Sequence, residues 1–202
     1  MRIDSTSFAN RQPIPAEFAA GARGGEQGFG GNKNPHLAWH DVPDATRSFA
    51  VLCIDVDVPT NPALVADSST PIPVDHPRGE FVHWVVANIP SHVREIAAGS
   101  CSAGFTVGGK PAGKDAGGVR GINDYTHWFA GDAAMGGQYF GYDGPYPPAH
   151  DLRMHRYFFR VFALDVDTLE LPAVFTAADV FRAMHGHVLA EAAMHGTYSL
   201  NG

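Results

Sequence analysis

Polar side chains interrupt three strongly apolar stretches of the sequence, and their types suit a binding site or acid–base chemistry. Asp55 and Asp57 end the first stretch, His83 lies inside the second, and His155 and Tyr157 open the third. Burying such groups costs free energy unless partners are supplied. Residues two apart in an extended chain project to the same face, so we expect the two aspartates to share one rim, and likewise the histidine and tyrosine of the third stretch.

Each of these residues also has an ordinary structural interpretation. An aspartate at a strand end is often a turn residue, and a single histidine within a strand is more often a hydrogen-bonded core residue than a ligand. Periodicity alone does not bring the three stretches together. If their ends converge, one pocket holds two carboxylates, two imidazoles and a phenol, which can accept and donate hydrogen bonds to a polar ligand.

The three stretches have the composition of buried β-strands. Residues 47–56 are apolar on both alternating faces, which predicts a central strand. Residues 81–89 and 155–164 are rich in β-branched and aromatic side chains. Long connections rich in glycine and proline separate the strands, instead of regular amphipathic helices. This pattern disfavours a βαβ fold and favours a mainly β, antiparallel sandwich.

Helix is expected only near the C-terminus. Thr176 begins a sequence that resembles a capping box. Apolar residues then recur at three- or four-residue spacing over residues 180–192. We predict two short helices, with Gly186 as the break between them and Gly196 as the end of the second.

Length and composition limit the class of protein. The chain has 202 residues, of which 45% are apolar and 17% charged, as is typical of one globular domain. We expect a single domain over residues 1–202, with an irregular N-terminal segment at 1–30. No apolar run is long enough to span a bilayer, and residues 1–10 do not resemble a signal peptide. We therefore expect no integral membrane association, and cytoplasmic residence.

Charge and local motifs exclude several other classes. The net charge of −7 and the scarcity of lysine argue against a nucleic-acid partner. The glycine-rich stretch 21–35 lacks the fingerprint of a phosphate-binding loop, so we expect a flexible connection there and no cofactor. Cys53 and Cys101 are expected as thiols rather than a disulfide. His185 and His187 would diverge on a helix, so no metal is expected.

Five short motifs follow one another along the chain. They are GNKNPHLAW at 31–39, DVDVP at 55–59, HWVVANIP at 83–90, GPYPP at 144–148 followed by HRY at 155–157, and GHVLA at 186–190. In this order they resemble the signature segments of the phosphatidylethanolamine-binding protein family, in its bacterial, Raf-kinase-inhibitor-like branch.

The resemblance implies a fold and a site. The fold is an antiparallel Greek-key β-sandwich with short C-terminal helices, and a cavity at one end holds phosphate or a phosphorylated headgroup. The ligand-binding positions that the motifs assign are Asp55, Asp57, His83, Gly144, Pro145, Pro148, His155 and Tyr157. We therefore expect a small-anion-binding protein, for which the family further suggests a regulatory or inhibitory role towards a protein partner, and a homodimer.

An enzyme is the alternative interpretation. Two carboxylates and two imidazoles in one apolar-walled cavity could act as general acid and base for a lyase, isomerase or cyclase acting on a small metabolite. The catalytic candidates would then be Asp55, His83 and His155. No Gly-x-Ser-x-Gly elbow is present, which disfavours a serine hydrolase.

The sequence departs from the family motifs in three places. Val56 stands where the motif has its first proline, so we expect Asp55 to be held less rigidly. The stretch 71–80 adds residues near the pocket entrance, and the stretch 126–140, which includes Trp128, is enlarged. Loops of this kind often form lids or partner surfaces. A bulkier ligand than the family's usual anion would fit such a change.

Overall fold

Two antiparallel β-sheets make up the fold, and the computed structural model describes residues 1–201. The strands are β1 (Arg2–Asp4), β2 (Leu37–His40), β3 (Ser48–Pro59), β4 (Arg78–Pro90), β5 (Glu95–Ile96), β6 (Lys114–Asp115), β7 (Gly118–Arg120), β8 (His155–Leu164) and β9 (Val188–Tyr198). The helices are α1 (Pro62–Ala66), α2 (Tyr125–Trp128) and α3 (Ala177–Ala183), with single 3-10 turns at Ala16–Phe18 and Glu26–Gly28. The large sheet has the order β6-β7-β4-β3-β8-β9 and the small sheet the order β1-β2-β5.

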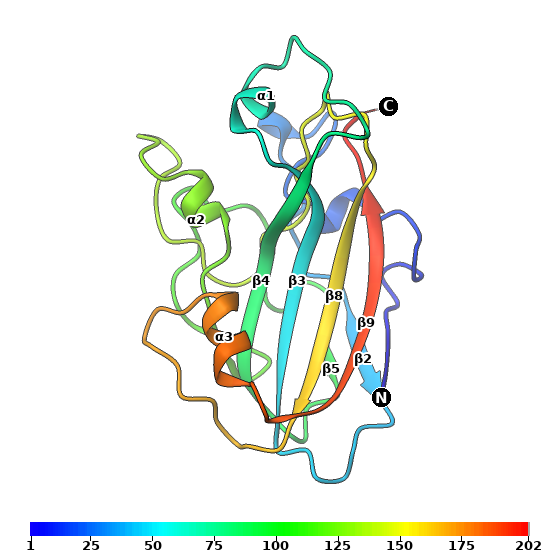
Figure 1. The fold of residues 1–202 in the computed structure, drawn as a ribbon, viewed down its shortest axis with the longest axis vertical. Coiled ribbons are helices and arrows are strands. Elements are labelled where there is room, and N and C mark those ends of the chain that lie inside the picture. Colours follow the sequence, from blue (N-terminus) through cyan, green and yellow to red (C-terminus); the bar gives the residue numbers. More distant parts are fainter. Residues whose placement is uncertain (202) are drawn as a thin grey trace.

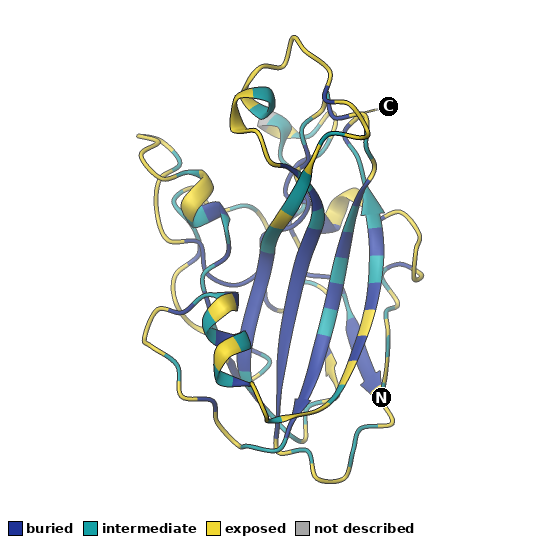
Figure 2. Cartoon of the chain, in the orientation of Figure 1, coloured by how far each residue is buried: buried dark blue, intermediate teal, exposed yellow. Residues whose placement is uncertain are grey.

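The predicted mainly β, antiparallel sandwich is confirmed. β3, β4 and β8 coincide with the three apolar stretches, and β3 lies between the other two (Figure 1). β8 returns beside β3 through a long connection, as in a Greek key. β3 is buried along nearly its whole length, whereas the loops around the sheet ends are largely exposed (Figure 2). No helix among residues 1–201 is long and apolar enough to cross a membrane.

The small sheet and one face of the large sheet enclose the larger of two hydrophobic core clusters. Trp39 of β2 packs edge-on against Phe49 of β3, with ring centroids 5.3 Å apart, and both side chains are fully buried. Trp84 of β4 and Phe159 of β8 belong to the same cluster. A fully buried phenylalanine contributes roughly 1.5–3 kcal/mol by leaving water, so this layer fixes the strands that carry the site.

α3 covers the opposite face of the large sheet. Val180 of α3 belongs to a second buried cluster with Leu52 of β3 and Val85 of β4. The predicted capping box is confirmed, because the Thr176 hydroxyl accepts from the backbone N–H of Asp179 while the Asp179 carboxylate accepts from the backbone N–H of Thr176. These two bonds satisfy backbone donors that the first helical turn would otherwise leave unpaired.

The second predicted C-terminal helix is wrong, because residues 188–198 form the edge strand β9. Gly186, with φ of +84°, makes the turn that leads from α3 into this strand. Ala192, Met194 and Gly196 are buried and alternate with more exposed neighbours, which is the period of a strand. Pairing with β8 thus overrides local helix propensity. Gly196 therefore lies within the strand instead of ending a helix. A glycine is needed there because a Cβ would come 2.4 Å from Ile14 Cγ1.

The last residues of the glycine-rich stretch 21–35 are packed into the structure, whereas residues before them are partly or fully exposed. Asn32 and Asn34 are both fully buried. Oδ1 of Asn34 accepts a hydrogen bond from the backbone N–H of Cys101 at 2.7 Å. Cys101 and Cys53 are both buried free thiols, as predicted.

Candidate functional site

A cavity of about 460 Å³ lies at the end of the large sheet where β3 ends and β8 begins. Its volume falls in the range of small-molecule sites. The residues that line it come from the sheet end, α1, α2 with the turn that follows, the 146–150 loop and two further segments. They are Phe29, Asp55, Val58, Pro59, Val65, Ser68, Phe81, His83, Tyr125, Trp128, Phe129, Met135, Tyr146, Pro147, Pro148, Ala149, His150, His155, Tyr157 and Leu200.

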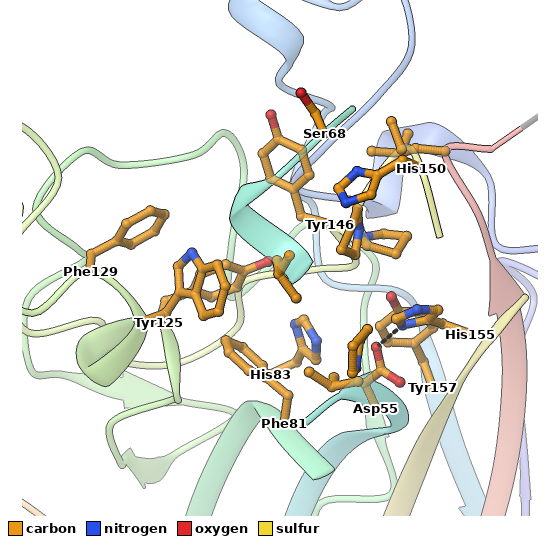
Figure 3. Close-up of a pocket in the computed structure, with 18 of the residues that line it drawn as sticks. Asp55, Ser68, Phe81, His83, Tyr125, Phe129, Tyr146, His150, His155 and Tyr157 are labelled. Carbon is orange, nitrogen blue, oxygen red and sulfur yellow. Dashed lines mark hydrogen bonds and ion pairs between the residues drawn. The ribbon is translucent and has the colours of Figure 1, made fainter. Parts of the chain in front are cut away.

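Strand register brings the polar side chains of the cavity together. Asp55 of β3 lies opposite Phe81 of β4 and opposite Tyr157 of β8. His155 is two residues from Tyr157 on the same strand. Figure 3 shows these side chains with His83 along one side of the cavity. The convergence that spacing alone could not establish is therefore a consequence of antiparallel pairing.

A β-bulge places His83 in the cavity. Cys53 pairs with Trp84 and the next residue of β3, Ile54, pairs with Val82, so β4 contains one additional residue at this point. That residue is His83. A bulge of this kind changes the direction of a side chain and is common beside functional sites. The imidazole packs against Tyr157, with ring centroids 5.2 Å apart.

His155 is held at both ring nitrogens by carboxylates. Nδ1–H donates to Oδ2 of Asp55 at 2.7 Å, and Nε2–H donates to Oδ2 of Asp151 at 3.0 Å. Both oxygens of Asp151 in turn accept from the Arg78 guanidinium. The four side chains form a chain of alternating sign, with two carboxylates balanced by two cations. All four are at least nine-tenths buried in this network.

This arrangement fixes the charge of the buried groups. Burial on its own would lower the pKa of His155, but the hydrogen bonds and charges of Asp55 and then Asp151 outweigh it and raise that pKa. Burial would likewise raise the pKa of Asp151, yet the hydrogen bond from Arg78 and the other donors hold it below its usual value. His155 is therefore an imidazolium, and both of its N–H groups donate to carboxylates of the protein.

Asp55 is held on both carboxylate oxygens. Oδ2 accepts from His155, and Oδ1 accepts from the backbone N–H of Asp57 at 2.8 Å. These hydrogen bonds orient the Asp55 carboxylate, and the expectation that Val56 leaves this residue less rigidly held than a proline would stays a prediction.

His83 has the opposite chemistry from His155. Its Nδ1 lies 2.7 Å from the backbone oxygen of Asp143, so Nδ1 carries a proton and donates. Burial lowers the pKa of His83, although the negative charges of Asp55 and Asp143 partly offset this effect. The neutral ring then has an acceptor lone pair at Nε2, and no hydrogen bond from the described residues engages that atom.

Asp143 anchors His83 from behind the cavity. Its fully buried carboxylate accepts from Asn32, Asn123 and the Lys110 ammonium. Its backbone oxygen accepts from His83, and its backbone N–H donates to the carbonyl of His83 at 3.0 Å. This network fixes the segment that leads to the proline-rich wall.

The Tyr157 hydroxyl is buried without a partner. The side chain is fully buried, and its hydroxyl makes no hydrogen bond of good geometry with the residues that the structure describes, although the Asp55 carboxylate lies close beside it. Burial and the nearby charge of Asp55 raise the pKa of this phenol well above its ordinary value, so it keeps its proton. An unpaired hydroxyl of this kind costs about 1–3 kcal/mol, which makes it the feature of the cavity that most needs a ligand.

Asp57 lies outside the cavity lining. The register shift between Asp55 and Val58 puts an additional residue in β3, so the two aspartates do not share a rim as the period of two predicted. The Asp57 carboxylate instead accepts from Arg153 and Arg156. Burial would raise its pKa, but the hydrogen bonds of Arg156 and Arg153 hold it below the usual value.

The predicted wall residues divide in the same way. Pro148 lines the cavity, whereas Gly144 and Pro145 lie behind it. The backbone N–H of Gly144 donates to Asn32 at 2.8 Å, and a Cβ there would come 2.2 Å from the backbone oxygen of Phe18. Glycine is required at this close approach.

Three contributors to the site carry no sequence signal of their own. Asp151 lies in a loop and Arg78 opens β4 before its apolar stretch, and an isolated bridge between Ile72 and Asp151 brings the Asp151 loop beside the segment that leads into β4. Tyr125 lies in α2 and donates through its hydroxyl to Gly144 at 3.0 Å. The sequence leaves open whether the stretch 126–140 is a lid or a partner surface, and in the structure Trp128 of this stretch lines the cavity.

Histidines elsewhere do not assemble with other ligands. Nδ1 of His187 lies 2.9 Å from Asp165, in an ion pair that is about half exposed on both sides. Among residues 1–201 no group of three or more histidine, cysteine, aspartate or glutamate side chains has the geometry to hold a metal ion.

The chain is similar to known proteins along nearly its whole length. The family model described as phosphatidylethanolamine-binding protein matches residues 4–199. A UPF0098 protein of Aquifex aeolicus is 33% identical over 98% of this chain and 88% of its own length, and YbhB of Escherichia coli is 30% identical over 98% and 100%. The crystal structure of E. coli YbcL, described as a new member of the mammalian PEBP family, superposes with a TM-score of 0.70 at 25% identity, covering 98% of this chain and 97% of that one.

Proposed function

The chain belongs to the phosphatidylethanolamine-binding protein family, and from this premise we propose that it binds a small phosphate-type anion in the cavity at the end of the large sheet. The phosphate group would sit against Tyr157 and His83, with Pro148 as part of the wall. Asp55 and His155 would hold these two side chains in place. Asp57, Gly144 and Pro145, which the family motif also assigns to the ligand, would support the site from outside the lining.

The observation that carries the proposal is the Tyr157 hydroxyl. It is a proton donor, it is fully buried, and it lacks a partner within the described residues. A phosphate oxygen is a strong acceptor, so a bound anion would remove the cost of leaving this donor unpaired. Few other donors compete for that role, because both N–H groups of His155 are already used by carboxylates.

The charges beside the cavity cancel one another, so a bound anion would not meet a cluster of cations. Two carboxylates and two cations cancel in the chain from Asp55 to Arg78. An anion would therefore contact an uncompensated positive charge only if His83 took up a proton at Nε2. Protonation of His83 would turn an acceptor into a second donor beside Tyr157.

Paired tyrosine variants test this proposal. Tyr157→Phe is expected to weaken binding of inorganic phosphate and phosphorylethanolamine by about tenfold, as for loss of one hydrogen bond to a charged group. Tyr142→Phe is the matched control. It removes a buried hydroxyl that does not line the cavity and that already donates to the backbone oxygen of Phe18, at 2.7 Å. Calorimetric titration measures both. If no anion binds the wild type at millimolar concentration, or if both variants bind equally well, the proposal is wrong.

Acid–base catalysis is the second candidate, and the state of His83 is the observation that favours it. A neutral imidazole with an open Nε2 can accept a proton from a bound substrate. A screen of small metabolites by NMR would detect turnover. His83→Ala should abolish that turnover, and turnover that survives this change would remove His83 from an acid–base role.

The family resemblance also suggests a regulatory role and a homodimer, and the sequence pattern suggests cytoplasmic residence. These stay predictions. Regulation would require the ligand-bound cavity to present its loops to a partner, which a pull-down with and without phosphate would measure.

A further inference from the structure

Most of the cavity surface is apolar, so a phosphate group alone would contact only a small part of it. The polar groups gather where β3, β4 and β8 meet. The remainder of the lining is dominated by aromatic and aliphatic side chains, of which the largest are Phe29, Phe81, Tyr125, Trp128, Phe129 and Tyr146. A volume of about 460 Å³ leaves most of the space unfilled when one phosphate group occupies the polar end.

One aromatic wall is built from α2 and the turn that follows it. The rings of Tyr125 and Phe129 stack with centroids 5.7 Å apart and an interplanar angle of 14°. Phe129 also contacts the ring of Tyr139, at 5.5 Å between centroids. Phe81 meets Tyr125 edge-on at 5.0 Å. These contacts join the wall to the polar end, because Phe81 lies opposite Asp55 in the sheet.

Hydrogen bonds hold the turn of this wall in place. Oδ1 of Asp132 accepts from the backbone N–H groups of Ala134 and Met135 at 2.8 and 2.9 Å. The backbone oxygen of Met135 accepts from the Tyr139 hydroxyl at 2.6 Å. Met135 is thus positioned at the cavity by a closed turn. The wall is preformed, which lowers the ordering cost of binding.

Trp128 is the exposed part of this wall. Its side chain is 46% exposed at the cavity rim, whereas the other two tryptophans of the chain are fully buried. Large exposed aromatic groups beside a cavity mark binding surfaces. Tyr146, on the opposite loop, is also partly exposed and contacts Phe29 edge-on at 6.2 Å. An apolar ligand body would cover both rims.

From this arrangement we propose that the ligand is an aromatic phosphate monoester, with its phosphate at Tyr157 and His83 and its ring between the aromatic walls. The inference rests on the proposed anion site and adds the chemical class of the ligand body. Aromatic walls favour a ring over a flexible alkyl chain, because edge-to-face and offset-stacked contacts add to the burial of area. Free phosphate and phosphorylethanolamine would leave these walls exposed to water.

Calorimetric titration with four probes tests the inference. They are inorganic phosphate, phosphorylethanolamine, butyl phosphate and phenyl phosphate. Phenyl phosphate is expected to bind at least about tenfold more tightly than inorganic phosphate, which is what burial of one ring supplies. Butyl phosphate should fall between them. The ligand should also change the fluorescence of the exposed Trp128.

Variants of the wall supply the control. Phe129→Ala and Trp128→Ala should each reduce the ratio of phenyl phosphate affinity to inorganic phosphate affinity several-fold. Val174→Ala, which shortens an exposed apolar side chain outside the cavity, should leave the ratio unchanged.

The outcomes separate this inference from the proposed function. If inorganic phosphate binds and phenyl phosphate binds no more tightly, the aromatic ligand class is wrong while the anion site stands. If none of the four probes binds, the anion site itself is wrong and the ligand class falls with it. Equal loss of both affinities in the two wall variants would also overturn the aromatic ligand class.

Discussion

Nδ1 of His155 donates to Oδ2 of Asp55 across 2.7 Å, and both side chains are almost completely buried. The contact joins β8 to β3, so it is a structural link as well as a feature of the cavity. Because the second nitrogen of His155 is bound to Asp151, this imidazolium has no donor left for a ligand. The two histidines of the cavity therefore have different tasks, with His155 supporting the site and His83 available to the ligand.

Breaking this pair should destabilise the protein strongly. Asp55→Asn leaves the buried imidazolium of His155 with only one of its two carboxylate partners. Loss of one partner of a buried ion pair typically costs about 3–5 kcal/mol. Asp165→Asn is the matched control, since the Asp165–His187 pair is about half exposed and should contribute about 1 kcal/mol or less. Urea unfolding at pH 7 measures both. Similar losses for the two variants would show that the buried pair is not a principal support.

The same contact predicts how stability changes with pH. The pKa of His155 is raised in the folded protein, so the folded state holds this proton more tightly than the unfolded chain does. Its contribution is fully present below the unfolded pKa of about 6.5 and is lost as pH rises through the folded value. NMR titration of the His155 ring gives the folded pKa, and unfolding at several pH values gives the linkage. A folded pKa below 6.5 would contradict the assignment of an imidazolium.

Much of the fold could be predicted because three strands carry strong periodic signals. The apolar stretches of β3, β4 and β8 are long, and burial on both faces leaves few alternative structures. β9 could not be predicted in this way. Its sequence includes Ala190, Glu191 and Ala192, which favour helix locally, and only pairing with β8 makes it a strand.

The site was predictable only in part, for a related reason. His83 and Tyr157 stand out because they interrupt apolar strands. The period of a regular strand predicts Asp57 in the cavity, but one additional residue in β3 turns it towards Arg153 and Arg156. Register shifts depend on the partner strand, so the spacing of a single strand cannot reveal them.

Removing the unpaired hydroxyl should stabilise the protein. Tyr157→Phe deletes a buried donor without a partner and is expected to raise the free energy of unfolding by about 1 kcal/mol. Tyr142→Phe should lower it by about the same amount, because the carbonyl of Phe18 then loses its donor. Thermal and urea unfolding without ligand measure both changes. A less stable Tyr157→Phe variant would mean that the hydroxyl has a structural partner in solution.

Anion binding should draw a proton onto His83. In the free protein burial lowers the pKa of His83, so the ring is neutral near pH 7. A bound anion favours the imidazolium and raises that pKa, which makes affinity fall as pH rises. Sulfate is the suitable probe because it does not itself titrate in this range. Calorimetry in buffers of different ionisation enthalpy should report uptake of up to one proton per sulfate at pH 7.

Two variants decide whether His83 is the group that takes up this proton. His83→Asn keeps a polar side chain but cannot gain the charge, so proton uptake should disappear and the affinity should lose its dependence on pH between 5 and 8. His92→Asn removes an exposed histidine away from the cavity and should behave as the wild type. Uptake that persists in His83→Asn would assign the proton to another group. Tight binding with no uptake in the wild type would mean that neutral donors alone hold the anion.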